Sequence, residues 1–306
     1  MPGAHTINAG AEASTLSCGA GKALAGLIGA GIQRSLTPAM HEEEARHHGL
    51  RLHYQLIDLA QTNTGVEQLP GLMAAARSMG FAGLNITYPC KQAVIPWLDD
   101  LSDEARAMGA VNTVVIRGGK LIGHNTDGSG WSNAFRRALP QADLCRVVLL
   151  GAGGAGAAIA HAALRMGTRH LVINDCEPQR AQALAHSLNA LYGSGRASAD
   201  SEVAHALPSA SGLIHATPTG MDKRPGLPLP EPLLRDDLWV SEVVYFPIET
   251  ALLKAARARG CATVDGGGMA VWQAVGAFRL ITGIEPDPER MQAHFRRLLA
   301  ARADVD

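Results

Sequence analysis

The sequence predicts an α/β protein with two domains, each built on a mainly parallel sheet. Short apolar runs typical of strands alternate with longer helical segments along most of the chain, as in parallel sheets. A length of 306 residues is enough for two domains. Residues 147–164 form a strand-type run, a glycine-rich turn and a strong helix former, which is the arrangement that opens a Rossmann-type domain.

The first half of the chain predicts one α/β domain over residues 1–125, of which 1–22 form a tail of small and polar residues. Pro38 suits the first turn of a helix. The expected strands lie at 24–29, 52–58, 81–87 and 109–116. The expected helices lie at 38–48, 66–79 and 101–108.

The second half predicts a Rossmann-type domain over residues 126–270, and helices in 271–306 that return to complete the first domain. Its expected strands lie at 147–150, 171–174, 212–217, 238–244 and 262–264. Its expected helices lie at 131–139, 157–164, 178–191, 198–206, 248–259, 269–281 and 287–302.

Composition excludes several classes of partner. A net charge of −1 gives no field for nucleic acid or an anionic membrane. No apolar run is long enough to span a bilayer, and the N-terminus lacks the pattern of a secretory signal. The five cysteines have no C-x-x-C spacing, and His47-His48 has the pattern of a surface pair. We therefore expect a cytoplasmic protein with reduced thiols and no metal.

The central turn has the pattern of a dinucleotide site. Gly151, Gly153 and Gly156 form G-x-G-x-x-G, and Gly154 and Ala155 complete the turn. In a dinucleotide site the first glycine makes the turn, the second lets pyrophosphate approach the backbone, and the third packs the helix on the strand. The phosphates then lie at the positive end of the helix. The alternative is a helix-capping turn without a ligand.

The next strand ends in an acidic residue, and this favours NAD over NADP. Asp175 lies about 20 residues beyond the glycines, where a carboxylate accepts hydrogen bonds from the ribose diol and repels a 2′-phosphate. Glu177 adds a second acid, and Arg180 is a nearby cation that suits adenine or a phosphate. NAD is the expected cofactor, with NADP left open.

Polar side chains also gather where strands of the first domain end. Parallel sheets place ligands at the carboxyl ends of their strands. Five polar residues fall at that edge: Ser35, Thr37, Asn85, Thr87 and Lys91. The two hydroxyls precede a helix and suit an anion or carboxylate, although an ordinary helix cap is the alternative. Asp127 precedes another helix, and its ordinary role would also be a cap.

Six ordered motifs together resemble the shikimate/quinate dehydrogenase family over residues 24–290. They are S-L-T-P-A-M-H at 35–41, N-I-T-Y-P-C-K at 85–91, G-A-V-N-T at 109–113, G-H-N-T-D-G at 123–128, V-V-Y-F-P-I-E-T at 243–250 and M-A-V-W-Q-A at 269–274. The resemblance implies reversible oxidation of a ring hydroxyl of quinate or shikimate, in quinate degradation or in aromatic amino acid biosynthesis through the shikimate pathway. The implied partner is a small-molecule substrate, and the implied assembly is a monomer or homodimer.

The resemblance also implies a role for each site residue. Lys91 is the general acid/base. An unperturbed lysine is a poor base at neutral pH, and a nearby carboxylate favours its charged form, so Asp127 is assigned orientation more than activation. The substrate carboxylate falls to Ser35 and Thr37, with Tyr245 near it. Ring hydroxyls fall to Asn85, Thr87, Asn112 and Gln273. The nicotinamide falls to Val243 and Gly266, and the dinucleotide channel to Pro218.

Five positions depart from the usual family pattern. Arg34 stands where His is usual, Thr37 where Ser is typical of strict shikimate enzymes, and Asp175 where NADP-type members have Arg. His215 replaces the usual Asn, and Glu242 the usual Asp. The changes at 37 and 175 resemble the NAD-dependent branch that oxidises quinate as well as shikimate. Two rivals stay open: a paralogue acting on an amino-analogue or another cyclic polyol acid, and a catalytically silent NAD-binding regulator.

Overall fold

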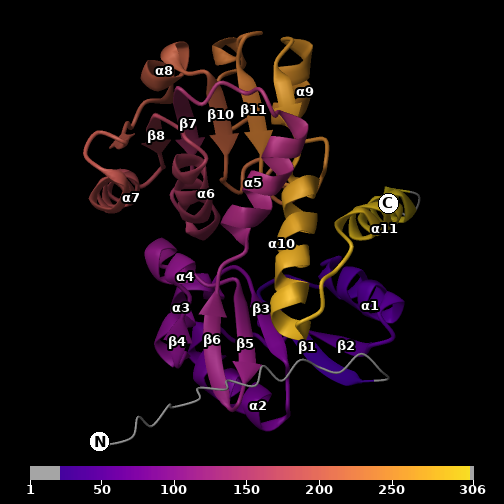
Figure 1. Ribbon diagram of the computed structural model, residues 1–306. Coiled ribbons are helices and arrows are strands. Elements are labelled where there is room, and N and C mark those ends of the chain that lie inside the picture. Colours follow the sequence, from indigo (N-terminus) through magenta and orange to yellow (C-terminus); the bar gives the residue numbers. More distant parts are fainter. Residues whose placement is uncertain (1–20, 304–306) are drawn as a thin grey trace, which may run out of the picture.

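The computed structural model describes residues 21–303, which form two six-stranded sheets with helices on their faces (Figure 1). The predicted tail over 1–22 lies outside the described residues except at its end, where Lys22 already begins the first strand. The predicted α/β class with two sheets is confirmed. Among residues 21–303, no helix is long and apolar enough to cross a membrane.

The first sheet has the strand order β2-β1-β3-β5-β6-β4. Three of its strand pairs are parallel, and β5 runs antiparallel to both β3 and β6. Its strands are β1 (Lys22–Gly29), β2 (Arg51–Asp58), β3 (Gly83–Ile86), β4 (Asp100–Leu101), β5 (Thr113–Arg117) and β6 (Lys120–His124). The helices of this half are α1 (Thr37–His47), α2 (Leu69–Ser78), α3 (Cys90–Ala93) and α4 (Asp103–Met108).

The second sheet has the order β12-β11-β10-β7-β8-β9, and all its pairs are parallel. Its strands are β7 (Arg146–Leu150), β8 (His170–Asn174), β9 (Ala197–Ala199), β10 (Gly212–His215), β11 (Trp239–Glu242) and β12 (Ala262–Val264). Its helices are α5 (Asp127–Ala138), α6 (Gly154–Arg165), α7 (Pro178–Tyr192), α8 (Val203–Ala206) and α9 (Ala251–Ala258).

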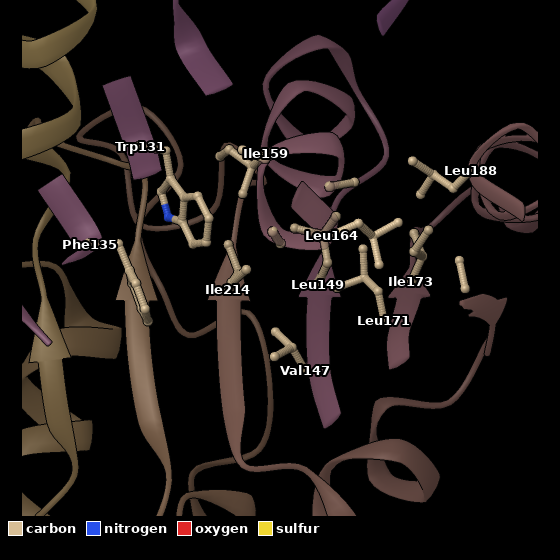
Figure 2. Packing of buried hydrophobic residues seen from close by; sticks show 14 of the residues in the cluster. Trp131, Phe135, Val147, Leu149, Ile159, Leu164, Leu171, Ile173, Leu188 and Ile214 are labelled. Carbon is tan, nitrogen blue, oxygen red and sulfur yellow. The ribbon is translucent and has the colours of Figure 1, made fainter. Parts of the chain in front are cut away.

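The strands of the second sheet are apolar on both faces because helices cover both. Alternate residues of β7 divide between two cores: Val147 and Leu149 face one, Val148 and Leu150 the other. Figure 2 shows the first core, where α6 and α7 contribute Ile159 and Leu188. Trp131 and Phe135 of α5 stack in the same core with their ring centroids 5.0 Å apart (Figure 2). A continuous apolar run with this alternation is typical of a doubly covered parallel sheet.

Two long helices connect the sheets. α10 (Gly266–Thr282) packs along α5 and also contacts β3, β5 and α1 of the first sheet (Figure 1). Gly130 permits this packing, because a Cβ there would lie 2.8 Å from the backbone nitrogen of Gln273. α11 (Pro288–Ala303) lies beside α1. The predicted domain boundaries fall just before α5 and inside α10, and they stay a prediction.

Several predicted bounds are wrong for local reasons. The helix expected at 198–206 is the edge strand β9 followed by the one-turn α8, because Ala197–Ala199 pairs with β8. The helix expected from 101 begins at Asp103 with Ser102 as its cap, since Asp100–Leu101 pairs with β6. α10 begins three residues early, at Gly266, because the side chain of Asp265 caps it.

Candidate active site

A lysine and a carboxylate meet between the two sheets. Lys91 lies in α3, directly after β3, and Asp127 is the first residue of α5. The Lys91 Nζ donates to Asp127 Oδ2 at 2.5 Å, and the side chains are 19% and 6% exposed. The carboxylate is therefore enclosed, while the ammonium keeps access to solvent and has hydrogens left for a ligand.

Asn112 fixes the carboxylate from the other side. Its Nδ2 donates to Asp127 Oδ1 at 2.8 Å and to Thr126 Oγ1 at 2.9 Å. The backbone amide of Asp127 donates to Asn125 Oδ1 at 2.9 Å. The alternative role of Asp127 as a helix cap is wrong, because Thr126 occupies the cap position of α5. Oδ1 of Asp127 is instead held by Asn112, which leaves Oδ2 directed at Lys91.

The two loop hydroxyls do not cap α1. Leu36 occupies the cap position, and no side chain bonds there. Ser35 Oγ accepts the amide of Thr37 at 3.3 Å, and the carbonyl of Thr37 contacts His41 Nδ1 at 2.9 Å. Both hydroxyls are half-buried. The loop is thus fixed through its backbone, which leaves the hydroxyl protons for a ligand.

Asn85 and Thr87 lie at the end of β3 and differ in burial and in hydrogen bonding. Asn85 is buried, and its Oδ1 accepts the hydroxyl of Tyr54 at 2.6 Å. Its Nδ2 donates to Thr113 Oγ1 at 3.1 Å and to the Asn112 carbonyl at 3.3 Å. Both amide hydrogens are therefore used inside the protein. Thr87 is half-buried, and its amide donates to the Ile28 carbonyl at 2.9 Å.

Gln273 and Tyr245 approach from the C-terminal part of the chain. The Gln273 carbonyl accepts Thr126 Oγ1 at 3.0 Å, which ties α10 to the start of α5. Its side-chain Nε2 donates to the carbonyl of Ala270 at 3.0 Å. Burial raises the pKa of Tyr245, Arg302 opposes the rise, and the negative charge of Asp127 adds to it. Tyr245 thus lies within electrostatic reach of the Lys91–Asp127 pair.

The glycine turn lies beside Lys91. Gly151 has φ +102°, and a Cβ on Gly156 would lie 1.9 Å from the Gly151 carbonyl oxygen. A Cβ on Gly153 would meet nothing within 4 Å, and one on Gly154 would lie 3.5 Å from Lys91 Cδ. Ala155 follows in the first turn of α6, a helix of 12 residues. The turn therefore combines an open backbone at a helix N-terminus with contact to the lysine.

Asp175 lies against this turn. Its Oδ2 accepts the amide of Ala152 at 2.7 Å, and its Oδ1 accepts the amide of Glu177 at 2.9 Å. Arg180 is exposed, and its Nη2 lies 2.9 Å from Glu177 Oε1. The carboxylate at the tip of β8 is thus oriented toward the glycines, and the nearby cation is paired with a different acid.

Pro218, Val243 and Gly266 follow the ends of three neighbouring strands, β10, β11 and β12. Pro218 is exposed and Val243 is half-buried. A Cβ on Gly266 would lie 2.4 Å from the Val243 carbonyl oxygen. Gly266 and Val243 are therefore in direct contact, as one wall at the carboxyl edge of the second sheet.

Sequence reasoning left several site residues without a role. Asn125 and Thr126 lie inside the G-H-N-T-D-G motif at 123–128, but their bonds to Asp127 and Gln273 depend on the fold. Tyr54 lies in β2, and no motif pointed to it. His215 and Glu242 were noticed only as departures, and they form a buried pair. Among residues 21–303, no group of three or more His, Cys, Asp or Glu could hold a metal ion.

Comparison with known proteins identifies the family. The family model described as the shikimate dehydrogenase substrate binding domain matches residues 27–114. A shikimate dehydrogenase (NADP(+)) of Streptomyces avermitilis is 57% identical over 92% of this chain and 97% of its own length. A quinate/shikimate dehydrogenase (NAD(+)) of Corynebacterium efficiens is 48% identical over 90% of this chain and 98% of its own.

A solved structure has the same architecture. Quinate dehydrogenase from Corynebacterium glutamicum, in complex with NAD, superposes with a TM-score of 0.84 and 46% identity. The match covers 90% of this chain and 99% of that one. The fold and the extent of the identity agree, and the chain belongs to the shikimate/quinate dehydrogenase family.

Proposed function

We propose that the protein is an NAD-dependent dehydrogenase that reversibly oxidises a ring hydroxyl of quinate, shikimate or both, giving 3-dehydroquinate or 3-dehydroshikimate. The closeness of the Lys91–Asp127 pair to the glycine turn carries this proposal, because only the space of one Cβ separates Gly154 from Lys91 Cδ. A group that moves a proton thus lies next to a turn that suits a dinucleotide.

The chain's own residues account for the proton. Oxidation of a secondary alcohol releases the hydroxyl proton as the C–H bond breaks, and Lys91 Nζ in its neutral form accepts that proton. A bound nicotinamide supplies the hydride acceptor, or the hydride donor in the reverse direction. Asp127 holds the Nζ in place and accepts a hydrogen bond from the substrate hydroxyl. Asn112 keeps the Asp127 carboxylate from turning away.

The residues around the turn fit a dinucleotide. The amides at the start of α6 and the open position at Gly153 suit a pyrophosphate. Asp175 suits the ribose diol, Val243 and Gly266 suit the nicotinamide end, and Pro218 suits the dinucleotide channel. The relatives are named for both NAD and NADP, so the assignment of NAD rests on the Asp175 carboxylate, which disfavours a 2′-phosphate.

The polar residues of the first sheet suit a hydroxylated ring acid. Ser35 and Thr37 would bind the carboxylate, with Tyr245 near it. Thr87 and Gln273 would bind ring hydroxyls. Asn112, which the resemblance assigns to the same task, has both amide hydrogens on Thr126 and Asp127 and its Oδ1 on other donors, so it would act on the substrate through Asp127. Asn85 has both amide hydrogens in use, so it would contribute only the second lone pair of its Oδ1. The cytoplasmic location, the monomer or homodimer state and the domain boundaries stay predictions from the sequence.

The test is NADH or NADPH formation at mildly alkaline pH with quinate and with shikimate, each with NAD and with NADP. We expect turnover with NAD on at least one of the two acids and little with NADP. Turnover only with NADP would overturn the cofactor assignment. Binding of NAD without turnover of either acid would favour one of the rivals, the paralogue or the silent regulator. The intact Lys91–Asp127 pair argues against the regulator.

A further inference from the structure

A second acid–base pair is completely buried where two neighbouring strands of the second sheet end. His215 is the last residue of β10 and Glu242 the last of β11, and the two are register partners. His215 Nδ1 lies 2.8 Å from Glu242 Oε1, and neither side chain has any exposed surface. Burying such a pair costs free energy unless every polar atom has a hydrogen-bond partner. The partners of this pair therefore show which segments it fixes in place.

The histidine holds the loop that carries Pro218. An ionised carboxylate only accepts hydrogen bonds, so Nδ1 of His215 carries the hydrogen. His215 Nε2 lies 2.6 Å from Thr217 Oγ1, and the Thr217 hydroxyl donates to it in the neutral tautomer. Thr217 Oγ1 in turn accepts the amide of Thr219 at 3.3 Å. The turn on either side of Pro218 is thus fixed through His215.

The glutamate holds the loop that carries Val243. Glu242 Oε1 accepts the amides of Val243 at 2.8 Å and Val244 at 2.9 Å. Glu242 Oε2 accepts the Thr250 hydroxyl at 3.0 Å. Gly266 packs against the carbonyls of the same two valines. Four described donors therefore converge on one carboxylate, and the backbone beside Val243 cannot shift without breaking some of these bonds.

The pair is also where the chain departs from its family pattern twice. His215 stands where Asn is usual, and Glu242 where Asp is usual. Sequence order does not connect the two positions, but the register of β10 and β11 does. His is longer than Asn and Glu is longer than Asp, and the two longer side chains meet between the strand ends. We propose that His215 and Glu242 are a coupled positioning pair that fixes the Pro218 and Val243 loops for hydride transfer, which rests on the proposed function.

The experiment is a double-mutant cycle with His215→Asn, Glu242→Asp and the double variant. The readouts are kcat, KM for the acid substrate, and the isotope effect on kcat with substrate deuterated at the oxidised carbon. Each single change should lower kcat at least about tenfold, because a misplacement of about 1 Å is costly in such a step. KM should change less than about threefold, since the acid is bound by the first sheet. The isotope effect should rise as hydride transfer becomes slower.

The double variant carries the decisive outcome. Both changes break the same hydrogen-bond network, so we expect kcat of the double variant to lie within about threefold of the more damaged single variant, which is strong non-additivity. Losses that simply multiply would overturn the coupling. Unchanged kcat and isotope effect in both folded single variants would overturn the positioning role. If the single variants do not fold, Thr217→Val removes only the outer hydroxyl of the network, and it should lower kcat several-fold and raise the isotope effect.

A matched control separates positioning from stability. Tyr192→Phe removes a hydrogen bond to a buried histidine of the same half, His161 Nδ1 to Tyr192 Oη at 3.1 Å. It should lower Tm without changing kcat or the isotope effect. Wild-type turnover is measured first. An inactive wild type would overturn the proposed function together with the role of the pair, whereas an active wild type with unaffected variants would overturn only the pair.

Discussion

Lys91–Asp127 and His215–Glu242 are both acid–base pairs at strand ends, but they differ in what is left unsatisfied. The lysine is 19% exposed and bonds one described acceptor, Asp127 Oδ2. In the histidine pair both ring nitrogens and both carboxylate oxygens bond to other protein groups, and nothing is exposed. A pair with spare hydrogens and an opening can exchange a proton with a substrate, whereas a saturated and closed pair can only hold geometry.

The largest effect should come from removing the open lysine. Lys91→Met keeps the length of the side chain and removes the group that accepts the proton. General acid–base catalysis contributes about 10²–10⁴-fold, so we expect kcat to fall about 10³-fold, with NAD affinity within about threefold. Steady-state kinetics and an NAD titration check this. Lys254→Met, on the exposed side of α9, is the control and should be silent. A loss of only a few-fold at Lys91 would mean that the open pair is not the acid/base.

The carboxylate partner should matter somewhat less. Asp127→Asn removes the negative charge that orients Lys91 Nζ and leaves one amide oxygen to serve both Asn112 and Lys91. We expect kcat to fall on the order of 300-fold, because the lysine is kept but misplaced. Tm should be measured in parallel, since the site is buried. A variant with wild-type kcat would show that Asp127 neither orients the lysine nor contacts the hydroxyl.

The next effect concerns the choice between NAD and NADP, which we expect the half-buried Asp175 carboxylate to decide. Asp175→Ser removes both the acceptor for the ribose diol and the charge that repels a 2′-phosphate. We expect the ratio of kcat/KM for NAD over NADP to fall about 100-fold, measured with one acid substrate. Glu202→Ser is the control, because Glu202 is an exposed acid of the same half that precedes α8 without a side-chain cap hydrogen bond. An unchanged ratio at Asp175 would assign that residue to the turn alone.

How much of this could be read from the sequence depends on whether a feature is local. The alternation of strands and helices and the glycine turn are local patterns, and they predicted both sheets. β4 and β9 were missed because strands of two and three residues are defined by pairing with β6 and β8 rather than by their own pattern. The residues proposed as catalytic were expected from motifs, and the structure brings Lys91 and Asp127 together with Asn112.

The supporting hydrogen bonds could not be predicted, because they join residues whose meeting depends on register. Tyr54 reaches Asn85 across the first sheet, and His215 meets Glu242 only because β10 and β11 pair in register. No pattern of residue spacing in the sequence predicts either contact. The motif departures at 215 and 242 were visible, but only the fold shows that the two residues lie side by side and bond to each other.

A buried histidine that belongs to neither pair gives the smallest expected effect. His41 lies in α1, and burial lowers its pKa to about 4, although the bond to the Thr37 carbonyl opposes the shift. Its Nε2 has no hydrogen-bond partner among the described residues, so no acceptor there supports a charge on the ring. The folded pKa lies below the unfolded value of 6.5. The unfolded state therefore binds more protons in acid, and stability falls as pH drops from 6.5 toward 4.

This predicts a stability effect with little effect on turnover. The free energy of unfolding contributed by His41 should fall by about 2 kcal/mol between pH 7 and pH 5. His41→Gln keeps a donor for the Thr37 carbonyl but does not titrate, so that part of the pH dependence should disappear, as measured by urea unfolding at the two pH values. His47→Gln, exposed on the same helix, should behave like wild type. If the His41 variant lost as much stability in acid as wild type, His41 would already be charged in the fold, and the substrate loop that it anchors would be held by a different balance of charge.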